Sequence, residues 1–193
     1  MNKYGITALI AALAVFLLSF SAGGRALAKE KKEAPKPACT IQEALKWAHG
    51  QKGKYIDMDG AYGAQCVDLI YAYYERLGVG RRGGNGADYQ YDEKLPKGWE
   101  RLYAADGAVP MPGDVVVWAG GAYGISSSCG HVGIIRSVSK KGNFRVFEQN
   151  YGADRSVTVN LHKAGEFTCL LRPNWSLADA VSQALAQYGL SLD

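Results

Sequence analysis

The sequence GAQCVDLIYAYYERL, residues 63–77, decides the fold of the first half of this 193-residue chain. Its apolar side chains recur at helical spacing and surround the segment widely enough to imply deep burial. They belong to Val67, Leu69, Ile70, Tyr73, Tyr74 and Leu77. Gly78 follows directly, and glycine commonly ends a helix. We therefore expect a buried helix that begins near Cys66.

The position of Cys66 in the first helical turn suggests chemistry. The positive end of a helix dipole favours the thiolate form of a cysteine, and the thiolate is the nucleophilic form. A buried, unreactive thiol is the alternative interpretation, and for a cysteine considered alone it is the better one. The rest of the chain has to decide between them.

The other expected elements place helices before strands. A capping signal at residues 40–43 predicts a helix to about His49, and Ser176 precedes an amphipathic helix over residues 176–193. Alternating patterns predict strands at 114–118, 131–138, 144–150, 156–162 and 167–172. Residues 78–112 carry many turn-forming residues and are expected to be irregular. This order indicates an α+β fold, with N-terminal helices packed on an antiparallel sheet and an extra C-terminal helix.

The N-terminus has the pattern of a secretory signal peptide. A short basic start precedes an apolar run over residues 6–20, and residues 26–28 have the small-x-small form of a cleavage site. We expect residues 1–28 to be removed and the protein to be secreted, extracellular or periplasmic, with no stable membrane association after cleavage. A retained anchor is the alternative, although the run is shorter than the ~20 residues of a spanning helix.

The remaining chain is organised as a linker and one domain. Residues 29–38 are charged and contain proline, which is typical of a linker, and residues 39–175 are expected to form the catalytic domain. Loss of Lys3 and Arg25 with the signal peptide lowers the formal net charge from +4 to +2. The sequence has no stripe of basic residues of the kind that binds nucleic acid, so we expect no nucleic-acid partner. We expect the protein to be a monomer.

Four cysteines lie beyond the signal peptide, and exported proteins often form disulfides. If Cys66 is a nucleophile, three thiols remain and one is unpaired. We favour a disulfide between Cys39 and Cys169, which would join the start of the domain to its last strand. Pairing of Cys39 with Cys129, or a pairing that includes Cys66, stays open.

A base for the thiol is expected at the start of a strand. A cysteine nucleophile needs an imidazole and a third group that orients the ring. His131 opens an apolar strand, whereas His49 and His162 are interpreted as solvated surface residues. Glu148 and Asn150 share one face of the next strand and could reach the same cleft. An exposed polar edge is the alternative for this pair.

Five ordered motifs carry a resemblance to a known family. They are GAQCVDLI (63–70), DYQYDEKLPKGW (88–99), MPGDVVVW (111–118), GHVGII (130–135) and EQNYG (148–152). In this order they resemble the CHAP family of cysteine, histidine-dependent amidohydrolases and peptidases. The resemblance covers about residues 40–173 and implies a papain-like fold.

The resemblance implies hydrolysis of amide bonds in peptidoglycan through a thioester acyl-enzyme. Cys66 would be the nucleophile, His131 the base and then the acid, Glu148 the orienting group and Asn150 an auxiliary polar residue. The enzyme would be an N-acetylmuramoyl-L-alanine amidase or an endopeptidase, and its partner a stem peptide or cross-bridge. A catalytically silent wall-binding module and an antibacterial toxin delivered to competitors are the alternatives.

Further residues are assigned to substrate and oxyanion contacts. The backbone N–H of Cys66 would bind the oxyanion, and the Gln65 side chain could assist it. Trp118, Tyr123 and Tyr151 could line a groove for an extended peptide.

A structural calcium ion is expected beside the nucleophile, although the chemistry itself requires no cofactor. Asp57, Asp59 and Asp68 offer hard oxygen ligands around a glycine-containing turn. The resemblance extends these ligands to Ala61 and Gly63, as backbone or water-mediated contributors. A solvated turn that caps the helix is the alternative.

Overall fold

The computed structural model describes residues 34–187. The expected signal peptide, the first part of the linker and the end of the last helix therefore lie outside the described residues. Within the described part of the chain, no helix is both long and apolar enough to span a bilayer.

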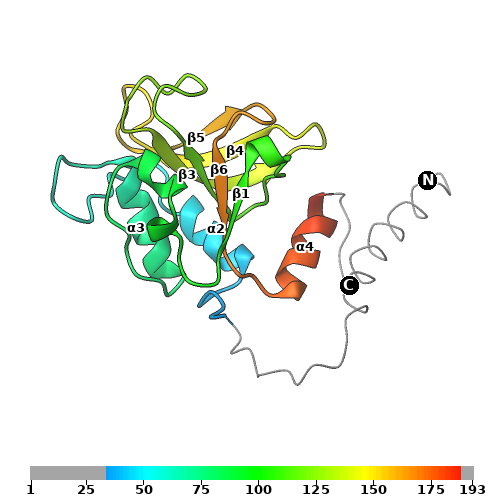
Figure 1. The fold of residues 1–193 in the computed structure, drawn as a ribbon. Coiled ribbons are helices and arrows are strands. Elements are labelled where there is room, and N and C mark those ends of the chain that lie inside the picture. The colour runs from blue at the N-terminus through cyan, green and yellow to red at the C-terminus, as the bar shows by residue number, and fades with distance from the viewer. Residues whose placement is uncertain (1–33, 188–193) are drawn as a thin grey trace. The chain divides into compact units, whose positions relative to one another are not determined.

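Three α-helices have the predicted positions: α2 (Ile41–His49), α3 (Cys66–Arg76) and α4 (Leu177–Gln187) (Figure 1). A capping box begins α2, because the Glu43 N–H donates to Thr40 Oγ1 (3.2 Å) and the Thr40 N–H donates to Glu43 Oε2 (2.9 Å). Gly78 follows α3 in a left-handed conformation, with φ of +74°. Local sequence signals therefore determine the start of α2 and the end of α3.

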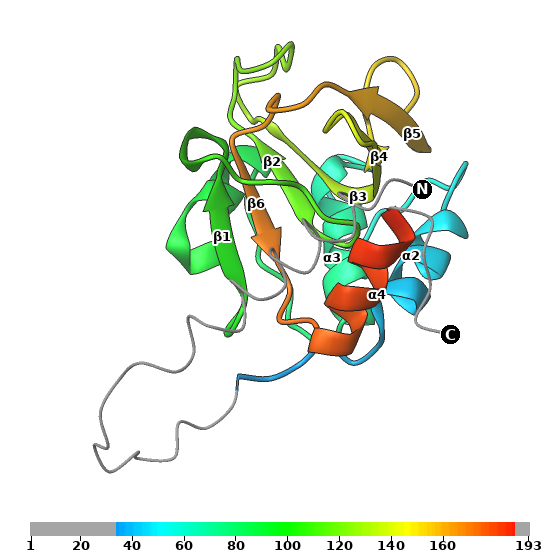
Figure 2. The ribbon, with the colours of Figure 1, turned by 90° about the vertical axis from the view of Figure 1, so that its right-hand side faces the viewer.

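Six antiparallel strands form one sheet, in the order β1-β6-β2-β3-β4-β5 (Figure 2). Their bounds are β1 Glu100–Tyr103, β2 Val115–Trp118, β3 His131–Val138, β4 Phe144–Gln149, β5 Val157–His162 and β6 Cys169–Arg172. Five of them match the prediction, and the α+β class is confirmed.

The sequence interpretation missed β1. This strand lies in the segment expected to be irregular, among the short 3₁₀ helices η1 (Gly86–Gln90), η2 (Asp92–Lys94) and η3 (Ala104–Asp106). Its four residues pair with β6, from Glu100 opposite Arg172 to Tyr103 opposite Cys169. The pairing is long-range, so a local pattern could not reveal it.

The sheet has an apolar cluster on each face. On one face α2 and α3 pack against side chains such as Val117, Ile134 and Phe147. On the other face a smaller cluster includes Trp118, Phe144 and Val146. Because α3 packs against β3, the helix that carries Cys66 is fixed against the strand that carries His131.

The predicted disulfide between Cys39 and Cys169 is wrong, because all four cysteines are free thiols. The Cys39 thiol lies 3.8 Å from the carbonyl oxygen of Arg76, at the end of α3. Cys169 is buried in β6, between β1 and β2. Burial raises the pKa of Cys39, and it raises the pKa of Cys169 to about 11. Both thiols are therefore mainly protonated at neutral pH.

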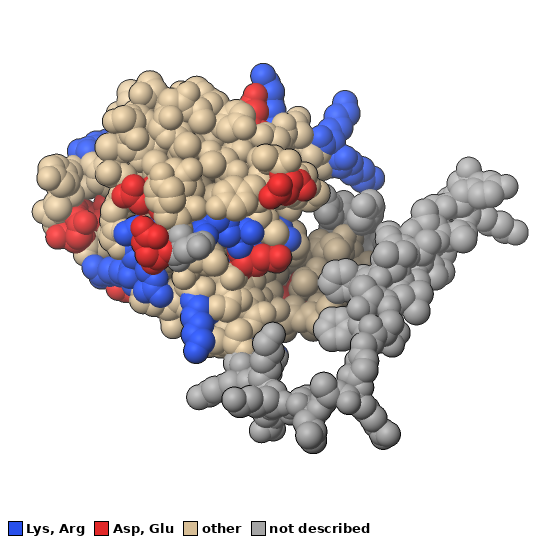
Figure 3. Space-filling model, viewed as in Figure 1, with Lys and Arg blue, Asp and Glu red and all other residues tan. Residues whose placement is uncertain are grey.

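Charged residues are dispersed over the face of the molecule shown in Figure 3. Blue and red side chains lie next to one another across its middle and lower part and again at its upper right, and a broad area without charges lies at its upper left. This distribution agrees with the modest formal net charge of +4.

Candidate active site

A cleft of about 490 Å³ opens at the start of α3. Its walls come from the ends of several elements rather than from their middles. The lining residues include Gln65 and Cys66, residues 84–86 before and at the start of η1, residues 124–127 and 129–131, and residues 150–152 after β4. The predicted nucleophile and the predicted base thus face one cavity.

Cys66, His131 and Glu148 form a connected hydrogen-bonded set. His131 Nε2 lies 2.9 Å from Glu148 Oε2, and the His131 side chain also hydrogen-bonds with Cys66. Since Nε2 is engaged by Glu148, Nδ1 is the ring nitrogen that remains for the thiol. Burial lowers the pKa of His131, but the hydrogen bonds and charges of Cys66 and Glu148 outweigh it and raise the pKa to about 9. The raised pKa favours the imidazolium form of His131 at neutral pH.

His162 is part of the site, and its interpretation as a solvated surface residue is wrong. It is only 8% exposed, and its Nε2 lies 3.0 Å from Glu148 Oε1. β5 pairs with β4 so that His162 lies opposite Phe144, on the face that carries Trp118. The sequence shows a histidine at a strand end, but only the strand register places it beside the glutamate.

Trp118 does not line the cleft, so that prediction is also wrong. Its side chain is completely buried, and its indole N–H donates to the carbonyl oxygen of Glu166 (2.6 Å). The indole packs against the rings of His131 and His162, with centroid distances of 5.7 and 4.7 Å. Trp118 therefore supports the histidines from within the core.

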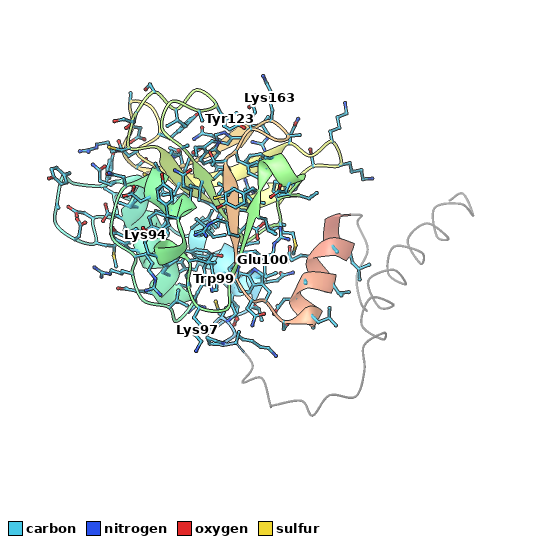
Figure 4. All side chains as sticks on the ribbon, viewed as in Figure 1. Lys94, Lys97, Trp99, Glu100, Tyr123 and Lys163 are labelled. Atoms are coloured by element: carbon cyan, nitrogen blue, oxygen red, sulfur yellow. The ribbon has the colours of Figure 1, made fainter. Side chains whose placement is uncertain are left out.

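Of the two tyrosines predicted to line the groove, only Tyr151 does so. Its ring lies 5.4 Å from that of His131. Tyr123 is half exposed and is not a lining residue. Figure 4 shows it in the upper part of the view, well away from Trp99 and Glu100.

The two predicted polar residues at the cleft wall, Gln65 and Asn150, bond to neighbouring protein groups. Gln65 precedes α3, and its side-chain amide donates to the carbonyl oxygen of Tyr62 (3.2 Å). Asn150 follows β4 in a left-handed conformation, with φ of +58°, and accepts from Arg155 Nε (3.3 Å). The same guanidinium donates to the Tyr62 carbonyl (3.0 Å). Arg155 thus connects the end of β4 to the loop before the nucleophile.

Gln149 fastens that loop to the sheet, a role that the sequence interpretation missed. Its buried amide accepts from the Ile56 N–H (2.8 Å) and donates to the carbonyl oxygens of Ile56 (2.7 Å) and Gln65 (2.6 Å). The bonds therefore hold both ends of residues 56–65. The only sequence signal was the position of Gln149 between two polar candidates.

The predicted calcium ligands come together where this loop meets α3, with Asp57 and Asp59 in the loop and Asp68 in the first turn of the helix. Each offers a carboxylate oxygen within 4.8 Å of the others. Asp68 is buried and accepts from the Met58 N–H (2.9 Å) and the Gln65 N–H (2.8 Å). Burial raises the pKa of Asp68, and the negative charges of Asp59 and Asp57 add to the increase. The cluster has the hard oxygen donors that calcium prefers, so its chemistry fits the ion.

The other two predicted contributors lie in the exposed turn. The Ala61 N–H donates to Asp59 Oδ1 (2.8 Å), and Gly63 has a φ of +69°. Gly63 has no side chain to offer, so only its backbone could contribute to an ion site.

Two glycines let the backbone approach the base closely. A Cβ on Gly86 would lie 2.9 Å from backbone atoms of His131, and a Cβ on Gly130 would lie 2.4 Å from the Trp118 carbonyl oxygen. Gly130 also has a φ of +66°, which other residues rarely adopt. The backbone around His131 is therefore closely enclosed on both sides.

Comparison with known proteins agrees with this geometry. The family model described as CHAP domain matches residues 55–150, a range that includes Cys66, His131 and Glu148. This chain belongs to the CHAP domain family. The fold prediction is supported in the same way, because a solved structure of the wild-type endolysin LysIME-EF1 superposes with a TM-score of 0.62. That match has 26% sequence identity and covers 72% of this chain and 66% of the other, which confirms the papain-like α+β fold.

Two CHAP relatives are phage endolysins. Endolysin PlyTW of Staphylococcus phage Twort is 28% identical over 155 residues, and endolysin LysK of Staphylococcus phage K is 34% identical over 98 residues. The matches cover 75% and 50% of this chain, but only 32% and 19% of the endolysins. The similarity is therefore to one part of each larger protein.

Proposed function

We propose that this CHAP protein is a peptidoglycan hydrolase that cleaves wall-peptide amide bonds with Cys66 as its nucleophile. The observation that carries the proposal is the hydrogen-bonded set of Cys66, His131 and Glu148 at the wall of an open cleft. The similarity to phage endolysins supports peptidoglycan as the substrate.

The proposed reaction uses one proton carrier in two steps. The Cys66 thiolate attacks the amide carbonyl carbon while His131 holds the proton, and the Cys66 backbone N–H stabilises the oxyanion. His131 then protonates the leaving amine, the C–N bond breaks and a thioester remains. A water molecule, deprotonated by His131, attacks the thioester and releases the carboxylate and the thiolate. Glu148 orients the imidazole throughout.

A zymogram on purified walls tests the enzyme hypothesis. The wild type is expected to clear the walls, and Cys66→Ala to abolish clearing. Cys39→Ser is the matched control, because its thiol lies at the end of α3 and outside the cleft. Equal clearing by Cys66→Ala, or no clearing by the wild type, would refute cysteine hydrolysis and favour the silent wall-binding module.

Mass spectrometry of the released fragments distinguishes the two bond types. An N-acetylmuramoyl-L-alanine amidase releases intact stem peptides with a free L-alanine amino group. An endopeptidase instead creates new ends within the stem or the cross-bridge. Tyr151 and residues 84–86 line the cleft and would contact either substrate.

We further propose a structural calcium ion held by Asp57, Asp59 and Asp68. The ion would neutralise three adjacent carboxylates and stabilise the loop before Cys66. A chelator is expected to lower the melting temperature, and added calcium to restore it. Asp57→Ala is expected to remove this response, whereas Asp106→Ala, at an exposed carboxylate in η3, retains it. A melting temperature that changes with neither chelator nor calcium would contradict the proposed calcium site.

Export is part of the proposal, because the substrate lies outside the cytoplasmic membrane. Cleavage after residue 28 predicts a mature protein that begins at Lys29. N-terminal sequencing of the protein recovered outside the cytoplasm tests this, and an intact Met1 there would favour the retained anchor.

A further inference from the structure

Glu148 is a buried carboxylate shared between two imidazoles. Its side chain has no exposed surface, and its two oxygens lie 2.9 Å from His131 Nε2 and 3.0 Å from His162 Nε2. We propose that His162 is a positioning residue whose Nε2–H holds Glu148 in the orientation that directs His131 at Cys66. This inference rests on the proposed cysteine hydrolysis.

The shared carboxylate defines the tautomer of His162. Burial alone would raise the pKa of Glu148, but the hydrogen bonds from His131 and His162 outweigh it and lower the pKa. The carboxylate is thus ionised at neutral pH and only accepts hydrogen bonds. Each imidazole must therefore present a protonated Nε2 to it.

Aromatic side chains prevent the His162 ring from turning away. Its centroid lies 4.7 Å from that of Trp118 and 5.6 Å from those of Phe144 and Tyr151. Trp118 is itself anchored through its bond to Glu166, so one wall of this enclosure is fixed. Enclosed in this way, His162 can act as a rigid support for the carboxylate.

Without this donor, Glu148 would have one buried oxygen without a partner. The carboxylate could then rotate, so that either of its oxygens accepts from His131 Nε2. The His131 ring would no longer be held in the orientation that faces the thiol. By analogy with the outer partners of metal-bound histidines, whose loss typically costs ~10- to 100-fold in activity, loss of this donor should cost a similar factor. The effect should fall on kcat, because His162 is not among the cleft-lining residues that would contact substrate.

Two substitutions separate the donor from the ring. His162→Phe keeps the flat ring but removes the N–H, whereas His162→Gln keeps an N–H at a similar reach. His49→Gln is the matched control, because His49 is an exposed histidine that contacts Phe147 rather than Glu148. The readouts are kcat and KM on solubilised wall fragments, and the rate of Cys66 alkylation by iodoacetamide, followed on the Cys66 peptide by mass spectrometry.

For His162→Phe we expect kcat to fall ~10- to 100-fold with little change in KM, and alkylation to slow in parallel. His162→Gln should recover most of both rates, and His49→Gln should match the wild type. Normal rates in folded His162→Phe would overturn the proposal. Equal losses in the Gln and Phe variants would also overturn it, because an N–H donor restored at this position would then recover nothing.

Nitrogen-15 NMR of the histidines in the wild type provides a test that needs no variant to fold. The Nε2 of His162 should carry a proton at neutral pH, and an Nδ1–H tautomer would overturn the proposal. Alkylation and NMR require no wall cleavage. Their success together with absent wall cleavage would refute the proposed function and leave the positioning role of His162 intact.

Discussion

The two walls of the cleft are held in place by different kinds of contact. On the sheet side, His131 and Glu148 are buried, hydrogen-bonded to each other and backed by aromatic rings. On the helix side, Cys66 follows a largely exposed loop that is held by side-chain bonds from Gln149 and Asp68 to backbone groups. Core packing therefore fixes the base and the body of the helix that carries Cys66, whereas a few polar contacts hold the loop that leads into the nucleophile. Damage to the sheet wall should affect chemistry first, and damage to the helix wall should affect stability as well.

The largest effect is expected for Glu148→Gln on the sheet wall. Glutamine offers one acceptor oxygen in place of two, so one histidine loses its partner and faces an N–H₂ donor instead. By analogy with the loss of the orienting acid in a catalytic triad, kcat should fall by about 10³- to 10⁴-fold. Steady-state kinetics on solubilised wall fragments measure it, with thermal melting as the control for folding. A loss below tenfold contradicts the role of Glu148.

Gln149→Leu probes the helix wall. It removes three hydrogen bonds and leaves half-buried backbone groups of Ile56 and Gln65 without these partners. At ~1 kcal/mol for each bond, the free energy of unfolding should fall by about 3 kcal/mol. Urea denaturation measures this, and activity should fall with it because the loop also positions Cys66. Asn160→Leu, which removes a half-buried amide bonded to Thr158 on β5, is the control and should cost less. Equal losses in the two variants would mean that Gln149 has no special role in holding the loop.

The pH dependence of activity probes the sheet wall in the wild type, because it reports the pKa of His131. The pKa of His131 is raised from 6.5 to about 9, so the imidazolium that protonates the leaving amine persists below pH 9 and is lost above it. kcat/KM should therefore fall about tenfold per pH unit above 9. The stabilisation from this raised pKa is complete below pH 6.5 and is lost as the pH rises to 9. An alkaline limb near pH 6.5 would show that Glu148 and Cys66 do not hold the proton on His131.

The smallest effect is expected for Thr40→Ala, at the start of α2 and away from both walls. It removes the capping box with Glu43 and should cost about 1 kcal/mol of stability. kcat should remain unchanged, as measured on the same wall fragments. A loss of kcat here would show that helix stability and the geometry of the cleft are coupled.

Local patterns were enough to predict the elements that carry the nucleophile and its base. Cys66 begins a helix, His131 begins a strand and Glu148 lies near the end of the next one, as the sequence indicated. The short strand β1 could not be predicted from local patterns, because its extended conformation depends on pairing with the distant strand β6.

The missed and misassigned residues depend on contacts between distant segments. His162 reaches Glu148 only through the pairing of β5 with β4, and Gln149 acts on a loop 93 residues earlier. Trp118 was assigned to the groove because it ends a strand near the cleft, but the register with β3 places it under the histidines. Sequence periodicity gives the face of a strand, and tertiary packing decides what covers that face.

The close backbone approach at Gly86 and Gly130 has a consequence for mutational tolerance. Neither residue has a functional group, yet a single added methyl at either would collide with the backbone on one side of His131. In a saturation library selected for wall clearing, both positions should stay glycine as strictly as Cys66 stays cysteine. Strict retention in such a library would therefore identify residues that enclose the His131 backbone as readily as it identifies residues that take part in the reaction.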